Sequence, residues 1–203
     1  MMNVSINEKP LEVSGRITIL EAAKKLEIRI PTLCHNDKLT SFAGCRICLV
    51  EVATKRSPDR SWLAPACNTN VEDGFIVKTD SEEVRRARIF IIELLLSRCP
   101  ESEELRAMAK EFGVPLDDAS ALGLVGDYLL NRAPRIDPTS CILCGLCVRV
   151  CAEIPTRYAI NFEGRGMKRR VTTPFNTLSD TCIGCGSCAY VCPTKTITVE
   201  EAS

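Results

Sequence analysis

The sequence is poor in histidine, in aromatic side chains and in net charge. Its 203 residues include one histidine, His35, one tryptophan and only 5% aromatic residues. A Rieske centre needs two histidine ligands, so that kind of site is excluded. Lys plus Arg and Asp plus Glu number 26 each. No overall field therefore favours binding to nucleic acid or to an anionic membrane.

Long apolar runs and phosphate-binding glycine motifs are also lacking. The most apolar stretch, Ile89 to Leu96, is too short to span a bilayer and contains Glu93. Residues 1–13 have no basic segment followed by an apolar run, so we expect no secretory signal and a soluble, cytoplasmic chain. No G-x-G-x-x-G motif follows a predicted strand, so we expect neither NAD(P) nor flavin on this chain itself.

Cysteine, in contrast, is abundant, with 13 residues. In a reducing compartment this number favours metal ligation over disulfides. Eight of them form two C-x2-C-x2-C-x3-C runs, which begin at Cys141 and Cys182, and Pro193 follows the second run. In two-cluster ferredoxins each run gives three ligands to one [4Fe–4S] cluster and its fourth to the other. A pair of zinc sites is the alternative.

The crossed pattern assigns the ligands of two [4Fe–4S] clusters. The predicted ligands of the first cluster are Cys141, Cys144, Cys147 and Cys192, and those of the second are Cys182, Cys185, Cys188 and Cys151.

Four further cysteines lie near the N-terminus. Their spacing, C-x10-C-x2-C and then a distant cysteine, resembles the plant-type [2Fe–2S] layout with a longer first gap. The glycine that precedes the C-x2-C pair, Gly44, is small where backbone would approach a cluster. A zinc knuckle is the alternative. The predicted [2Fe–2S] ligands are Cys34, Cys45, Cys48 and Cys67.

Cys99 is the thirteenth cysteine and has no partner nearby in the sequence. We expect a buried thiol there, and the alternative is a ligand to a cluster shared across an interface. Cys67 is preferred to Cys99 as the fourth [2Fe–2S] ligand because it lies between predicted strands of one domain.

The hydrophobic pattern predicts an α+β fold in three parts. Residues 1–80 form a β-grasp [2Fe–2S] domain, 81–133 a helical connector and 134–203 a bacterial-type 2[4Fe–4S] ferredoxin domain. The first part shows a hairpin around residues 4–13, a capping box at Thr18 and Glu21, and strands at Val50–Val52 and Phe75–Val77.

The connector and the last part also carry local signals. One helix is expected to start with an Asp80–Glu83 capping pair and to end near Arg98, and a second to run over 102–112 and end at Gly113. A third element is expected around Asp127–Asn131. The cysteine runs read as an internal duplication, with a hairpin between them. On that hairpin lies a basic stretch, Arg165, Lys168, Arg169 and Arg170, read as a solvated face or as a dock for an acidic partner.

Together these motifs resemble a known family of iron–sulfur electron-transfer subunits. They are similar to the N-terminal part of the large iron–sulfur subunit of respiratory complex I, and to the small diaphorase subunit of NAD-linked and electron-bifurcating hydrogenases and transhydrogenases. The matching segments are 31–34, 44–51, 65–67, 141–151 and 182–194. The resemblance implies an electron-transfer chain without a substrate site of its own.

Two departures from the family pattern bear on that expectation. The family usually carries a one-His, three-Cys cluster motif after its first long helix, but here 97–102 contains only Cys99, so we expect no intermediate cluster. The sequence stops at Ser203, so we expect the catalytic domain of longer relatives to be absent.

The partners follow from the resemblance and from electron counting. A nicotinamide transfers two electrons as hydride and a cluster transfers one, so a flavoprotein NAD(P)H-oxidoreductase subunit is expected to carry the flavin and NAD(P). A further redox subunit, a hydrogenase or transhydrogenase module, or a ferredoxin is expected as the low-potential partner, in a complex that could bifurcate electrons. No nucleic acid and no membrane span are expected. A free multi-cluster ferredoxin without a fixed complex is the alternative.

Overall fold

The computed structural model describes residues 1–116 and 140–198. Its internal contacts divide the chain into two units, Met1–Leu33 with Ser41–Ile91, and Cys34–Thr40 with Ile92–Ser203. The division falls inside helix α2 (Glu82–Arg98). The element expected around Asp127–Asn131 lies outside the described residues, and the three predicted domain boundaries stay predictions. No helix in the described part is long and apolar enough to cross a membrane.

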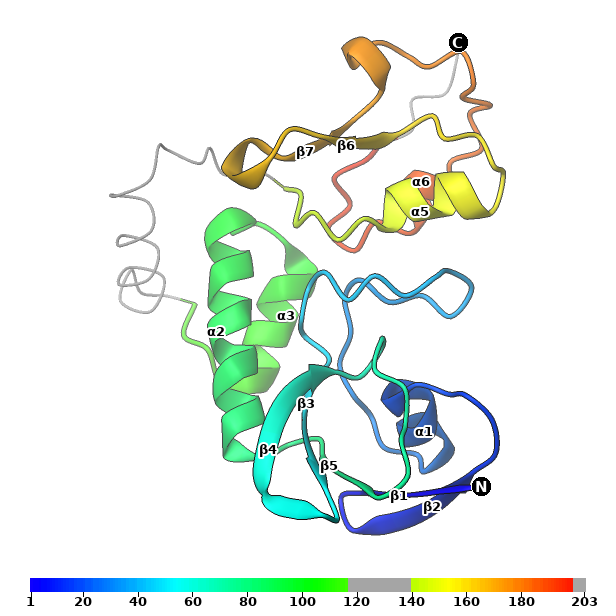
Figure 1. Cartoon of the computed structure of the whole chain (residues 1–203). Coiled ribbons are helices and arrows are strands. Elements are labelled where there is room, and N and C mark those ends of the chain that lie inside the picture. The colour runs from blue at the N-terminus through cyan, green and yellow to red at the C-terminus, as the bar shows by residue number, and fades with distance from the viewer. Residues whose placement is uncertain (117–139, 199–203) are drawn as a thin grey trace. The chain divides into compact units, whose positions relative to one another are not determined.

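The first unit is built on a five-stranded sheet with the order β2-β1-β5-β3-β4 (Figure 1). Strand β1 pairs antiparallel with β2 and parallel with β5, and β3 pairs antiparallel with both β4 and β5. This mixed sheet with one crossing helix is the predicted β-grasp arrangement. The strands are β1 (Met2–Ile6), β2 (Lys9–Val13), β3 (Leu49–Thr54), β4 (Ser57–Pro65) and β5 (Phe75–Lys78).

The β1–β2 hairpin and helix α1 (Ile19–Lys25) form as their local signals predict. Asn7 and Glu8 take left-handed φ values of 47° and 67°, as the tight turn of a hairpin requires. Thr18 and Glu21 form the predicted capping box, with the Glu21 N–H donating to Thr18 Oγ1 at 3.2 Å. The buried faces of the sheet and of α1 form one apolar core.

Strand β4 has no counterpart among the sequence predictions. Its first six residues are exposed, and Pro58 and Asp59 disfavour a strand by local propensity. Because β4 lies at the edge of the sheet and pairs only with β3, a proline there breaks no hydrogen bonds to a second neighbouring strand. The pairing of β4 with β3 therefore decides this segment, against its composition.

The helices after the sheet mostly agree with their predicted limits. Helix α2 ends at Arg98, and α3 (Glu103–Phe112) ends at Gly113, whose φ is 71°. The start of α2 differs from the prediction. Ser81 Oγ accepts from the Val84 N–H at 3.3 Å, while Asp80 forms an ion pair with Arg85 at 2.6 Å. The serine caps the helix, so the Asp80–Glu83 capping pair was a wrong reading of the first turn.

The C-terminal part of the second unit joins short helices to a small hairpin (Figure 1). Strand β6 (Asn161–Glu163) pairs with β7 (Arg170–Thr172), which confirms the hairpin between the cysteine runs. Two 3₁₀ turns flank β7, η1 (Gly166–Lys168) and η2 (Pro174–Asn176). Helices α5 (Leu146–Glu153) and α6 (Ser187–Tyr190) each begin inside one of the two cysteine runs.

Candidate iron–sulfur cluster sites

Three of the four predicted [2Fe–2S] ligands lie in the first unit. Cys45, Cys48 and Cys67 are all buried. The Ala66 N–H donates to the Cys48 carbonyl at 3.0 Å, which ties the segment before Cys67 to the end of the Cys45–Cys48 loop. The fourth predicted ligand, Cys34, is buried as well and belongs to the second unit.

A buried arginine holds the Cys45–Cys48 loop. Arg88 on α2 is 3% exposed, and it donates from Nε to the Ile47 carbonyl at 3.1 Å and from Nη2 to the Leu49 carbonyl at 2.7 Å. A buried guanidinium is costly unless its N–H groups are bonded, so these carbonyls fix its position. Sequence reasoning missed Arg88, because only its spacing from Val84 on the buried face of α2 separates it from its exposed neighbours Arg85 and Arg86.

Gly44 leaves room for the ring of Phe42. A Cβ at Gly44 would lie 2.5 Å from Cε1 of Phe42, so the absence of a side chain lets the ring lie against the backbone. The sequence predicted that backbone would approach a cluster at this position. The structure places the Phe42 ring against this backbone, and the approach of a cluster stays a prediction.

The two cysteine runs share a backbone conformation as well as a spacing. In each run the residues on both sides of the second cysteine are left-handed, Leu143 and Gly145 in the first (φ 55° and 72°) and Gly184 and Gly186 in the second (φ 67° and 70°). Each helix then starts directly after the glycine that follows the second cysteine, Gly145 or Gly186. This agreement in backbone supports the reading of an internal duplication.

The thiols predicted to hold the first [4Fe–4S] cluster lie near enough to one another to influence each other's pKa. Burial raises the pKa of Cys144 to about 11 and that of Cys147 to about 12. Cys141 and Cys192 lie close enough to add to both increases by charge repulsion. Cys192 comes from the second run, so the two runs meet here as the crossed pattern requires. Thiols this basic would lose their protons only beside strong positive charge, such as cluster iron supplies.

Backbone N–H groups point at several of these sulfurs. Leu143 N donates to Cys141 Sγ at 3.4 Å, and Thr196 N donates to Cys192 Sγ at 3.3 Å. Ala159 N donates to Cys151 Sγ, also at 3.4 Å. Donors to ligand sulfur are a means by which a protein raises the potential of an iron–sulfur cluster. The donor sets therefore fit clusters with cysteine ligands.

The second run is far more open to solvent. Cys182 and Cys185 are exposed, whereas Cys188 and Cys151 are half-buried. Burial is the main cause of a raised pKa at Cys188, and repulsion from Cys185 and from Cys151 of the first run adds to it. Hydrogen bonding to Ser187 lowers the pKa of Cys185. Cys151 of the first run thus lies near thiols of the second run, just as Cys192 of the second run lies near thiols of the first.

Helix α5 also holds the loop that contains Cys34, all within the second unit. Arg149 Nη2 donates to the Cys34 carbonyl at 2.6 Å, and Nη1 donates to the Thr40 carbonyl. Glu153, one turn further on, accepts from the Thr40 N–H at 2.7 Å and from its hydroxyl at 3.1 Å. We call these bonds the α5 clasp. Sequence reasoning missed it, because over a hundred residues separate its two halves.

Cys99 and His35 are not among the predicted cluster ligands. Cys99 is 1% exposed at the end of α2, as expected for a buried thiol. His35 Nε2 lies 2.9 Å from Asp37 Oδ1. Among the described residues no three Cys, His, Asp or Glu side chains converge as one metal ion would require. The three ligand sets therefore stay predictions.

Comparison with known proteins adds two domain assignments. A family model for a 2Fe-2S iron–sulfur cluster binding domain matches residues 1–82. A second, for a 4Fe-4S dicluster domain, matches residues 133–196. The cofactors of the chain are thus one [2Fe–2S] cluster and two [4Fe–4S] clusters.

Several curated proteins resemble the chain along nearly its whole length. NADP-reducing hydrogenase subunit HndD of Solidesulfovibrio fructosivorans is 36% identical over 99% of this chain and 36% of its own. A subunit of the NADH-quinone oxidoreductase of Rhizobium meliloti is 33% identical over 95% of this chain and 23% of its own. NADPH-Fe(3+) oxidoreductase subunit alpha of Geobacter sulfurreducens is 35% identical over 97% and 24%. The chain spans between about a quarter and about a third of these relatives.

A solved structure shares the fold. An NAD+-reducing [NiFe]-hydrogenase in the H2-reduced state contains a chain that is 25% identical, with a TM-score of 0.73 over 96% of this chain and 86% of that one. The chain therefore joins a 2Fe-2S domain to a 4Fe-4S dicluster domain, and along nearly its whole length it is similar to subunits of NAD(P)-linked hydrogenases and oxidoreductases.

Proposed function

We propose that the chain is the iron–sulfur relay of a cytosolic NAD(P)-linked oxidoreductase complex. Bound clusters supply one-electron chemistry. Cys34, Cys45, Cys48 and Cys67 would hold the [2Fe–2S] cluster, Cys141, Cys144, Cys147 and Cys192 the first [4Fe–4S] cluster, and Cys182, Cys185, Cys188 and Cys151 the second. The chain would exchange electrons with a flavoprotein on one side and a low-potential partner on the other.

The α5 clasp is the observation that carries this proposal. It fixes the loop of a predicted [2Fe–2S] ligand, Cys34, to the helix that begins inside the first cysteine run. Cys34 also lies close enough to Cys144 to contribute to its raised pKa. Predicted ligands of two different clusters thus lie on segments that direct bonds hold together, as a relay without an intermediate cluster would need.

The flavoprotein partner follows from the chemistry of the electron source. A nicotinamide gives up two electrons as a hydride, and clusters that take single electrons cannot accept that hydride directly. The hydrogenase and oxidoreductase names of the relatives agree with a pyridine nucleotide as the source. A flavin on another subunit would divide the pair.

Anaerobic purification followed by metal analysis tests the proposal. We expect about ten irons and about ten acid-labile sulfides per chain, from one two-iron and two four-iron clusters. We also expect NAD(P)H to reduce these clusters, seen by EPR, only when a flavoprotein co-purifies or is added. Two or three zinc ions without sulfide would overturn the proposal. Full clusters without any flavoprotein partner would instead identify a free carrier.

A further inference from the structure

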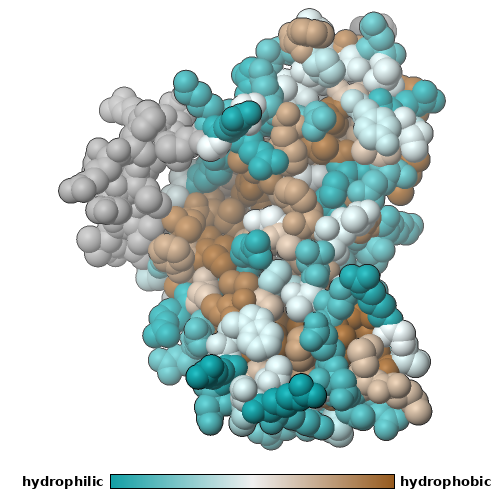
Figure 2. Space-filling model, in the orientation of Figure 1, coloured by the Kyte–Doolittle hydropathy of each residue, from teal (hydrophilic) through white to brown (hydrophobic). Residues whose placement is uncertain are grey.

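The second cysteine run lies among the most exposed apolar side chains of the described residues. Within residues 1–116 and 140–198, Met1 apart, every large hydrophobic side chain that is described and more than half exposed falls between positions 154 and 190. In Figure 2 brown apolar atoms reach the surface among teal polar ones in the upper part of the view. Apolar side chains rimmed by polar ones mark interaction sites. The exposed set is Ile154, Tyr158, Phe175, Leu178, Ile183 and Tyr190.

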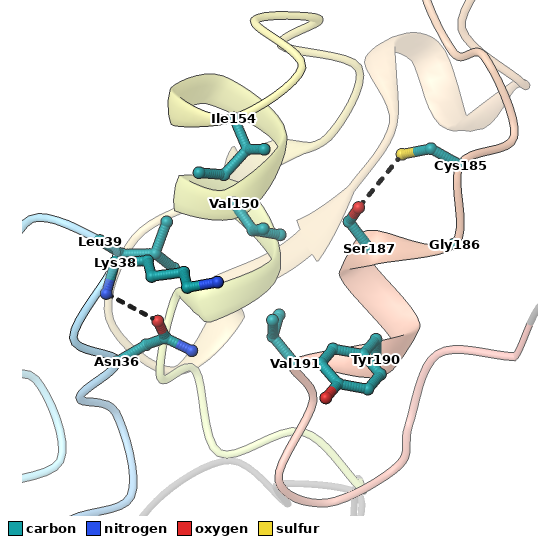
Figure 3. Close-up of a pocket in the computed structure, with 10 residues that line it drawn as sticks. All are labelled: Asn36, Lys38, Leu39, Val150, Ile154, Cys185, Gly186, Ser187, Tyr190 and Val191. Carbon is teal, nitrogen blue, oxygen red and sulfur yellow. Dashed lines mark hydrogen bonds between the residues drawn. The ribbon is translucent and has the colours of Figure 1, made fainter.

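Part of this surface is hollowed beside a predicted cluster ligand. A cavity of about 460 Å³ is lined by Ile154, which follows α5, by Tyr190 of α6 and by Cys185. Figure 3 shows Ile154 and the Cys185 sulfur near one end of the hollow and the Tyr190 ring near the other. Lys38 also lines the cavity, from the side formed by Asn36 and Leu39. A side chain from another protein could enter here and approach the second run.

The segment that forms most of this surface carries more positive than negative charge, although the whole chain is neutral. Residues 140–198 contain seven Lys and Arg but three Asp and Glu. Two of the three acids are engaged, Glu153 in the α5 clasp and Glu163 in an ion pair with Arg170 at 2.8 Å. Arg157 and Lys168 are exposed and form no ion pair with a described carboxylate. Arg157 is near enough to Cys185 to contribute to its lowered pKa.

We propose that the surface around the second run, formed by Lys38, Ile154, Arg157, Cys185 and Tyr190, docks a small acidic ferredoxin. An apolar centre with a charged rim is the usual composition of a protein interface, and small redox interfaces are typically weak and brief. A negative partner would be steered to this positive rim. The exposed thiols of Cys182 and Cys185 place the second site where a partner's cluster can approach.

The same charges exclude a second copy of this chain as the occupant. Two identical positive surfaces would face each other in a symmetric pair, and like charges across an interface are costly. The inference rests on the proposed function, because only a chain with its second [4Fe–4S] cluster would have an electron to exchange with the docked ferredoxin.

Binding of the full holoprotein to a purified acidic 2[4Fe–4S] ferredoxin tests the inference. Isothermal titration at 50 mM and 500 mM NaCl would compare the natural chain with a Lys38→Glu/Arg157→Glu variant. We expect Kd to rise at least about tenfold in the variant at low salt and about twofold at high salt, because salt screens exposed charges. A Tyr190→Ala variant should weaken binding about fivefold at both salts.

The control is an equal charge change elsewhere. Arg56→Glu/Arg60→Glu in the β3–β4 hairpin of the first unit alters the same number of exposed cations. This variant should bind ferredoxin as tightly as the natural chain does. Iron content and EPR spectra should match in all proteins, so that altered binding is not the result of cluster loss.

Separate outcomes overturn the inference and the proposed function. If the clusters are complete but the Lys38→Glu/Arg157→Glu variant binds ferredoxin as tightly as the Arg56→Glu/Arg60→Glu control does, the docking surface is wrong and the relay stands. Tighter binding of an acidic flavodoxin, or self-association lost in Tyr190→Ala, would also overturn the ferredoxin assignment. Absence of [4Fe–4S] clusters would overturn the proposed function and the inference with it.

Discussion

The two cysteine runs of this chain share a motif and a backbone conformation but occupy different surroundings. In the first run Cys144 and Cys147 are buried, and the helix that follows has eight residues and joins the α5 clasp. In the second run Cys182 and Cys185 are exposed, and the helix that follows has four residues. The same spacing of cysteines therefore occurs both in a buried and in an exposed run.

The difference teaches how one duplicated motif can take two roles. A buried cluster is shielded from water and is suited to passing electrons within a chain. An exposed cluster can exchange electrons with another protein. On this reading the first run is the internal relay and the second run is the terminal.

Loss of a ligand should be more damaging in the buried run. Cys147→Ser should remove about four irons and lower Tm by roughly 10 °C more than Cys185→Ser, because the buried site loses metal bonds that also hold its surroundings together. Iron analysis and thermal unfolding under anaerobic conditions would measure both effects. Equal losses of Tm in the two variants would remove the distinction between the runs.

Replacement of the predicted fourth ligand of each [4Fe–4S] cluster should give the next largest effect. Cys151→Ser should damage mainly the cluster of the second run, and Cys192→Ser mainly that of the first, because each of these residues lies near the thiols of the other run. EPR of the reduced variants would show which [4Fe–4S] signal is lost. Loss confined to each variant's own run would show that ligation is not crossed.

Breaking the α5 clasp should have an intermediate effect. Arg149→Ala removes bonds from a charged donor to the Cys34 and Thr40 carbonyls, so we expect the free energy of unfolding to fall by about 2–4 kcal/mol. Urea denaturation of the holoprotein would measure this, with exposed Arg60→Ala as the control. Arg149→Ala should also weaken magnetic interaction between the [2Fe–2S] and first [4Fe–4S] clusters. Unchanged stability and EPR would argue against the clasp.

Replacement of Cys99 should have the smallest effect. Because this thiol is buried but absent from the predicted ligand sets, Cys99→Ala should keep all of about ten irons and cost about 1 kcal/mol or less, as expected for a small side chain. Iron and sulfide analysis would check the count. A loss of two or four irons would make Cys99 a ligand.

Features set by neighbouring residues could be predicted from the sequence. The β1–β2 hairpin, the Thr18–Glu21 capping box and the Gly113 helix end depend on a few adjacent residues. The two cysteine runs are equally local, so their cofactors could be read directly.

Features set by distant residues could not be predicted. Strand β4 forms through pairing with β3, against its own composition. Arg88 and Arg149 resemble any other arginine in the sequence, and only tertiary contacts give them their carbonyl acceptors. The unequal exposure of the two runs likewise follows from packing, because their motifs are alike.

The rate at which a ferrous chelator removes iron tests the central contrast most directly. With reduced holoprotein and excess bathophenanthroline disulfonate, we expect a fast phase of about four irons from the exposed second run, followed by slower release of about six. EPR during the fast phase should show the [2Fe–2S] signal unchanged. A single phase for all irons, or a fast phase of about two, would contradict the assignment of a buried relay and an exposed terminal.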